Sequence, residues 1–167
     1  MSPWQKRLEV AVNLAIFCAF LMVAALAAKR FFERPVDARA RGPRVGAEVS
    51  LPGIDWKNSD LNLVLALSTG CHFCDESAGF YKRLIPTANS HGVQVLAVLP
   101  QPLSEGRTYL DSLGVSAPKV LESPLTVIGV SGTPTLLLLD RKGQIQKAWV
   151  GKLTPEGEQQ VFSSLQP

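Results

Sequence analysis

Hydrophobic and polar positions divide the chain into an apolar beginning, a short charged stretch and a longer region of alternating patterns. Val10 to Ala28 form 19 successive positions without a charge, interrupted by the polar Asn13. As a helix with a rise of about 1.5 Å per residue, this segment nearly spans the roughly 30 Å core of a bilayer. We therefore expect either one transmembrane helix or the apolar part of a signal peptide.

Two features favour a retained membrane anchor over a cleaved signal peptide. The run is longer than the roughly 7 to 15 apolar residues that are usual in a signal peptide. Lys29 and Arg30 follow at once and would crowd a cleavage site after Ala27. Cys18, inside the run, is interpreted as a small hydrophobic residue rather than a reactive thiol. We expect residues 1–28 to be an anchor, with the signal peptide as the alternative.

Residues 45–167 show the patterns of one α/β domain. Two compact apolar runs, Leu61–Ser68 and Val93–Leu99, are typical of strands buried on both faces. Helical spacing over residues 73–89 joins them, and Pro86 is expected to kink or shorten the end of that helix. The other expected elements are a short strand and turn in 45–56, a helix over 104–113 capped by Ser104, a short strand near 119–121, a short helix after Pro124, a hairpin of strands 135–139 and 144–150, and a helix over 155–165 capped by Thr154. This alternation predicts a central sheet flanked by helices, with an antiparallel pair at one side.

Charge is distributed unevenly along the chain, which carries +3 overall. Residues 29–44 carry +4 and residues 1–28 carry +1, so residues 45–167 carry −2. A slightly acidic domain argues against a nucleic-acid partner. We interpret residues 29–44 as a juxtamembrane linker, either solvated or held against the anionic headgroups of a lipid bilayer.

The positive-inside rule and the expected chemistry disagree about orientation. Six basic residues of the linker follow the apolar run and two precede it, which by that rule alone puts the domain in the cytoplasm. A disulfide-exchanging pair is most useful where disulfides persist, and long domains translocate largely regardless of charge. We expect a single-pass protein of the bacterial cytoplasmic membrane, with its domain on the periplasmic or extracellular side.

Cys71 and Cys74 are the candidate catalytic residues, at the junction between an expected strand and an expected helix. Cys71 would lie at the helix N-terminus, where unpaired N–H groups and the helix dipole favour a thiolate. Cys71 would then attack and Cys74 would resolve the mixed disulfide. Zinc binding is the alternative use of such a pair, but zinc needs four ligands and the only histidines are His72 and His91. We expect redox chemistry, no metal, and no cofactor other than the disulfide.

Auxiliary residues are expected between the cysteines and before the strand at 135. His72 either stabilises a Cys71 thiolate when protonated or is an exposed spacer with little effect. Phe73 either offers a docking surface to a partner or packs against the domain. In the sequence Gly132–Thr135, Pro134 begins an otherwise buried strand, which is unusual unless the ladder is interrupted, and a cis peptide is one such device.

The stretches STGCHFC and GVSGTPTLLLLDRKGQI, with Gly151 before the last helix, resemble the thioredoxin superfamily. More closely, they are similar to membrane-anchored redoxins of the TlpA-like and cytochrome c maturation type. The resemblance covers about residues 45–165 and implies a thioredoxin-like three-layer α/β sandwich preceded by the N-terminal transmembrane helix. It also implies that Pro134 is cis and that the Thr133 backbone pairs with a substrate chain beside the sulfurs.

The activity implied by this resemblance is that of a thiol-disulfide oxidoreductase that acts as a reductase. Its expected partners are protein thiols or disulfides of exported proteins, apocytochrome c among them, and a membrane or periplasmic electron donor. Two other functions stay open. A thiol peroxidase of redoxin type is suggested by STGC, although the proline expected upstream is missing. A non-enzymatic copper-handling assembly protein on the same fold usually spaces its cysteines by three and adds a distal histidine.

The chain departs from the family pattern around the cysteines. The departures are Gly70 in place of a common Trp, Gly79 in place of a helix proline, Leu65 in place of the buried acid of thioredoxin, and Ser77 in place of a Glu frequent in TlpA-like proteins. The group that accepts the proton of Cys74 is therefore open between Glu76 and water.

Overall fold

The computed structural model describes residues 4–5, 12–13, 16–17, 20–23 and 42–166. The chain divides into two units, residues 1–38 and 39–167. In the first unit the described residues are helical, and no helix built from described residues is both long and apolar enough to cross a bilayer. Most of the expected anchor at 1–28 and of the linker at 29–44 lies outside the described residues, so both stay predictions.

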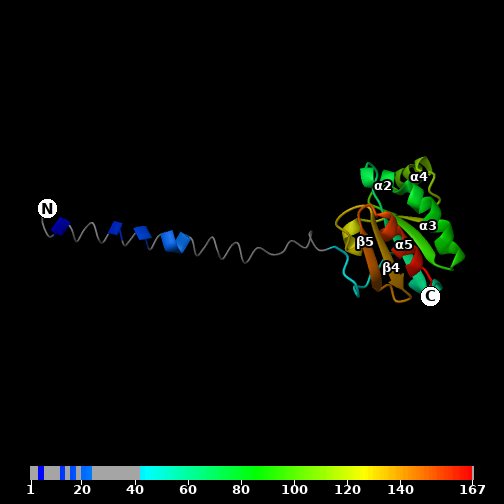
Figure 1. Cartoon of the computed structure of the whole chain (residues 1–167), viewed down its shortest axis with the longest axis horizontal. Helices are drawn as coiled ribbons and strands as arrows, with labels where there is room; N and C mark the ends of the chain where they lie inside the picture. Colours follow the sequence, from blue (N-terminus) through cyan, green and yellow to red (C-terminus); the bar gives the residue numbers. More distant parts are fainter. Residues whose placement is uncertain (1–3, 6–11, 14–15, 18–19, 24–41, 167) are drawn as a thin grey trace. The chain divides into compact units, whose positions relative to one another are not determined.

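A five-stranded sheet forms the centre of the second unit, with the strand order β3-β2-β1-β4-β5. Figure 1 shows β4 and β5 side by side in it. The first three strands run parallel, and the last two form the expected antiparallel hairpin. Their bounds are β1 (Leu61–Ala66), β2 (Gln94–Leu99), β3 (Lys119–Glu122), β4 (Thr135–Asp140) and β5 (Ile145–Val150). In the central strand β1, Ala66 lies opposite Val98 of β2 and Thr135 of β4. The carboxyl end of β1 therefore meets the start of β4.

Alternate residues of β1 face two different cores. Leu63, Leu65 and Leu67 face the side covered by α3 (Ala78–Ser90), α4 (Leu103–Ser112) and α5 (Pro155–Ser164). Val64 and Ala66 face the other side, which is covered by residues 49–56 and the short 3-10 helix η3 (Leu125–Ile128). The predicted three layers are present, but in the described part of the chain α-helices build one outer layer, while irregular chain and 3-10 turns build the other.

The helix expected over residues 73–89 consists of two helices. α2 (His72–Glu76) ends at Ser77, whose hydroxyl donates to the carbonyl of Phe73 at 2.7 Å, and α3 begins at the next residue. Pro86 does not end α3, which continues to Ser90. The Pro86 ring is exposed to solvent, and because proline has no N–H, the helix lacks one backbone hydrogen bond at this position.

The expected cap of α4 is also wrong. The helix begins at Leu103 after Pro102, and Ser104 lies within its first turn. The N–H of Leu103 donates instead to Oε2 of Glu122 at 3.0 Å, so a carboxylate from β3 caps the helix. A cap supplied from a distant strand cannot be seen in the local sequence.

The sequence prediction is wrong at the beginning of the domain and correct at its end. The leading strand expected in 45–56 is a single antiparallel bridge between Glu48 and Gln144, followed by η2 (Trp56–Asn58). α5, in contrast, begins as predicted, and the Thr154 hydroxyl accepts the N–H of Gly157 at 3.3 Å.

Candidate active site

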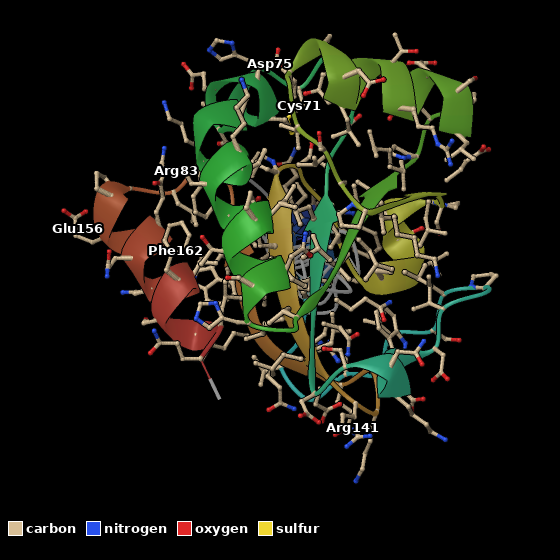
Figure 2. All side chains as sticks on the ribbon, turned by 90° about the vertical axis from the view of Figure 1, so that its right-hand side faces the viewer. Cys71, Asp75, Arg83, Arg141, Glu156 and Phe162 are labelled. Carbon is tan, nitrogen blue, oxygen red and sulfur yellow. A yellow bond between two sulfur atoms is a disulfide. The ribbon has the colours of Figure 1, made fainter. Side chains whose placement is uncertain are left out.

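The buried strand β1 leads directly to the cysteine pair. A three-residue loop, Ser68–Gly70, separates β1 and Leu67 from Cys71, which is the N-cap of α2. Gly70 adopts φ +72°, a left-handed conformation that favours glycine. Figure 2 shows Cys71 and Asp75 together at one end of the sheet beside α4, with Arg141 at the opposite end.

Cys71 and Cys74 form a disulfide, with 5.2 Å between their Cα atoms. The Cys71 sulfur also accepts the backbone N–H of Cys74 at 3.3 Å. When the disulfide is reduced, the same donor would stabilise a negative charge on Cys71. The expected placement of Cys71 at a strand-helix junction is thus observed.

The two sulfurs differ in access to solvent. Cys71 is partly exposed, whereas Cys74 is 0% exposed and belongs to the core on the helical side of the sheet. A protein partner approaching from outside therefore meets Cys71 first. This asymmetry fits an attacking Cys71 and a resolving Cys74.

The loop before β4 lies at the same end of the sheet as the cysteines, because Thr135 is paired with Ala66. The peptide bond between Thr133 and Pro134 is cis, as the resemblance implies. The N–H of Gly151 donates to the Pro134 carbonyl at 2.7 Å. Pro134 is buried and Thr133 is partly exposed, while their roles in substrate binding stay predictions.

His72 and Phe73 both lie on the surface. Phe73 is 53% exposed, so it does not pack into the domain, and its role in docking a partner stays a prediction. The His72 side chain is 78% exposed, and its Nε2 lies 3.3 Å from Oε1 of Glu76. His91, the other histidine weighed as a zinc ligand, is the C-cap of α3.

Two acidic side chains of α2 are paired with residues that sequence reasoning missed. The Lys152 ammonium donates to Oε2 of Glu76 at 3.0 Å, and this hydrogen bond lowers the pKa of Glu76 below its ordinary value of 4.5. The Tyr109 hydroxyl donates to Oδ1 of Asp75 at 2.6 Å. Burial, reinforced by the Asp75 carboxylate, raises the pKa of Tyr109. Neither partner is visible from local patterns, because each comes from another element.

α3 carries a second tyrosine, which is fully buried. Tyr81 is 0% exposed, and its hydroxyl has no hydrogen-bond partner among the described residues. Burial raises its pKa to about 12, so this phenol stays protonated at neutral pH. Among the described residues, no three His, Cys, Asp or Glu side chains are grouped so that they could hold a metal ion.

Known proteins that are similar to this chain are named as thiol-disulfide oxidoreductases. No protein-family model matches the sequence. The thiol-disulfide oxidoreductase ResA of Geobacillus thermodenitrificans is 28% identical over 103 residues, which cover 59% of each chain. The ResA of Halalkalibacterium halodurans is 25% identical over 126 residues, covering 73% of this chain and 70% of its own. The chain thus matches less than two thirds of the Geobacillus protein's length.

Solved structures identify the fold. A thiol:disulfide interchange protein of the thioredoxin family from Chlorobium tepidum superposes with a TM-score of 0.56 at 17% identity, covering 75% of this chain and 99% of its own. The domain has a thioredoxin fold. A second Chlorobium tepidum structure, described as the thiol:disulfide interchange protein DsbE, gives a TM-score of 0.55 at 23% identity, over 75% of this chain and 98% of its own. This thioredoxin fold is the α/β class that the sequence predicts.

We predict that Lys152→Met raises the pKa of Glu76 toward its ordinary value, because the ammonium that favours the carboxylate is lost. A folded-state pKa below the unfolded value contributes stability above about pH 4.5, and this contribution is lost as the pH falls through the folded pKa. Carboxyl-carbon NMR titration measures the shift.

Lys147→Met is the matched control, since the Lys147 ammonium donates to Ser164 and not to Glu76. The control should leave the Glu76 titration unchanged. Equal Glu76 pKa values in the Lys152→Met variant and the unaltered protein would contradict the assigned cause.

Proposed function

We propose that the chain is a thiol-disulfide oxidoreductase that reduces disulfides through Cys71 and Cys74. The observation that carries this proposal is the disulfide at the start of α2, with one partly exposed and one buried sulfur, at the end of the sheet where the cis-Pro134 loop begins. The names of the similar ResA proteins support the same reaction.

The reaction transfers two electrons in two exchange steps. The Cys71 thiolate attacks one sulfur of a substrate disulfide, which forms a Cys71–substrate mixed disulfide and releases the other substrate sulfur as a thiolate. Deprotonated Cys74 then attacks Cys71, forming the intramolecular disulfide and releasing the second substrate thiol. The protein dithiol is oxidised and the substrate disulfide is reduced. A dithiol donor must regenerate Cys71 and Cys74.

The residues around the sulfurs have distinct parts in this proposal. Phe73, 53% exposed beside Cys71, offers an apolar contact to a protein substrate. The partly exposed Thr133 backbone would pair with the substrate chain next to the sulfurs. The exposed His72 would add positive charge near Cys71 when protonated. Exported proteins with paired cysteines are the substrate class, with apocytochrome c as one candidate.

We also propose that residues 10–28 hold the domain at a bacterial cytoplasmic membrane, on its periplasmic side. The uncharged length of this segment supports an anchor, and the basic residues of 29–44 suit anionic lipid headgroups. Disulfide exchange with exported proteins favours the outer face, where disulfides persist.

The first test traps the mixed disulfide. The full chain in detergent, with Cys18→Ala to leave two thiols, is reduced and exposed to oxidised glutathione. The Cys74→Ala variant should accumulate one glutathione adduct per chain on Cys71, because no resolving thiol is present. Intact-mass spectrometry counts the adducts. The Cys71→Ala variant is the control and should stay nearly unmodified, because Cys74 is buried; equal adduct formation in both variants would refute the assigned roles.

The direction of electron flow is tested by the reduction potential. Equilibration of the same protein in glutathione buffers, followed by thiol trapping, should give a value near roughly −270 mV or below, which is typical of a reductase. A value near about −120 mV would instead identify an oxidant. Absence of any reversible disulfide between Cys71 and Cys74 would overturn the proposed function itself.

The orientation is tested in intact bacterial cells that express the chain. A membrane-impermeant maleimide should label Cys71 of the Cys74→Ala variant without lysis, and the protein should stay in the membrane pellet after alkaline carbonate washing. Labelling that requires lysis would place the domain in the cytoplasm, as the positive-inside count suggests. Release by carbonate would argue against the anchor.

A further inference from the structure

The loop that delivers Cys71 to α2 is held by side chains that follow β2. We propose that Gln101 is a positioning residue: its amide holds the loop Ser68–Gly70 in the conformation that places Cys71 at the start of α2. This role rests on the proposed function, because its purpose is to set the reactivity of Cys71. Gln101 acts through the loop, by its two hydrogen bonds to Ser68 and Thr69.

Without such a tether the loop has little to fix it. Gly70 has φ +72°, and a Cβ built at this position would meet no atom within 4 Å. Glycine also loses more conformational freedom on ordering than any other residue. Inside the loop, the N–H of Cys71 donates to the Ser68 carbonyl at 3.3 Å and the Ser68 hydroxyl donates to the Thr69 carbonyl at 3.4 Å. Gly70, directly before Cys71, is therefore not held in place by side-chain packing of its own.

The oxygen and the nitrogen of the Gln101 side-chain amide both form hydrogen bonds with this loop. Its Oε1 accepts the backbone N–H of Thr69 at 3.3 Å, and its Nε2 donates to the Ser68 hydroxyl at 2.8 Å. A backbone N–H can only donate, so the amide oxygen has to face Thr69 and the orientation of the amide is determined. Two bonds from one partly buried side chain hold two consecutive loop residues.

The first turn of α4 adds a third tie. The Thr69 hydroxyl donates to Oε1 of Glu105 at 2.8 Å. The start of α4 is itself fixed to β3, through the bond from Leu103 to Glu122. Because β1 and β2 run parallel, the residues after both strands reach the same edge of the sheet. The topology therefore brings Gln101 beside a loop that is more than 30 residues away in sequence.

Loosening this tether should act on the reduced protein. The Cys71 sulfur accepts the N–H of Cys74 only while Cys71 stays at the N-cap of α2. Freed at Gly70, a Cys71 thiolate would lose part of this stabilisation, so the pKa of the thiol would rise. Since thiolate stabilisation favours the reduced form, reduction of the disulfide would become less favourable.

The test compares Gln101→Ala with Gln146→Ala in the full chain carrying Cys18→Ala, in detergent. Gln146 is exposed on β5 and donates to Asp140, so its loss removes a glutamine hydrogen bond far along the chain from the cysteines. Two quantities are measured: the pH dependence of Cys71 alkylation by iodoacetamide, and the equilibrium constant for reduction by glutathione. Thermal unfolding checks that both variants are folded.

For Gln101→Ala we expect a raised pKa of Cys71 and an equilibrium constant for reduction about fivefold lower, which corresponds to a typical net hydrogen bond of about 1 kcal/mol. Gln146→Ala should match the unaltered protein in both quantities. Ser68→Ala removes the hydroxyl that accepts the Gln101 amide, together with its own 3.4 Å bond to the Thr69 carbonyl. It should shift both quantities in the same direction by less, and it provides the test should Gln101→Ala not fold.

Unchanged values in folded Gln101→Ala, or in Ser68→Ala if that variant has to replace it, would overturn the positioning role. That outcome is distinct from failure of the proposed function. In the latter case the unaltered protein would form no reversible disulfide between Cys71 and Cys74.

Discussion

The candidate site depends on the pairing of β1 with a neighbour on each side. β1 is parallel to β2 and antiparallel to β4, with Ala66 opposite both Val98 and Thr135. This single register brings three separate segments to one end of the sheet: the cysteine helix after β1, Gln101 after β2, and the cis-Pro134 loop before β4. A slip of one residue would turn the buried leucines of β1 to the opposite face, so the core on both sides of the strand fixes the register.

The turn after β5 links two parts of the site through adjacent residues. Gly151 donates its N–H to the Pro134 carbonyl, and Lys152 pairs with Glu76 on α2. A carboxylate close to a developing thiolate would oppose its charge. The ammonium of Lys152 offsets part of this repulsion at Glu76, while at Asp75 the neutral Tyr109 hydroxyl only donates a hydrogen bond to the carboxylate. Two acidic residues directly after Cys74 are therefore compatible with a reactive Cys71.

Local signals were sufficient for elements whose stabilising contacts lie close in sequence. The β4–β5 hairpin and the Thr154 cap of α5 were predicted because each depends on neighbours within a few residues. β1 pairs with distant strands, but its burial on both faces shows in the sequence as an unbroken apolar run. The fold class followed from the order of these elements and from the resemblance carried by STGCHFC and the Thr133–Pro134 motif.

Features that depend on distant partners were missed or misplaced. Glu122 caps α4 from another strand, so Ser104 was the wrong choice. The break at Ser77 was hidden because apolar spacing continues across it. Gln101 gave no chemical signal of its own, yet the rule that parallel strands end at one edge would have placed it near the cysteine loop.

The acceptor of the Cys74 proton, left open between Glu76 and water, can now be argued from the environment of each group. An ordinary thiol has a pKa near 8.5, while that of Glu76 lies below 4.5 because Lys152 favours the carboxylate. Proton transfer from Cys74 to Glu76 is therefore uphill, but transfer to neutral water is more so, and basicity does not favour water. Access does, because Glu76 is on the surface while Cys74 is fully buried. Tyr81, with a pKa of about 12, stays protonated and cannot accept the proton at neutral pH. Of the two acceptors, water is the one that can reach Cys74 once the mixed disulfide has opened the Cys71 side, and it passes the proton on to a base in solution.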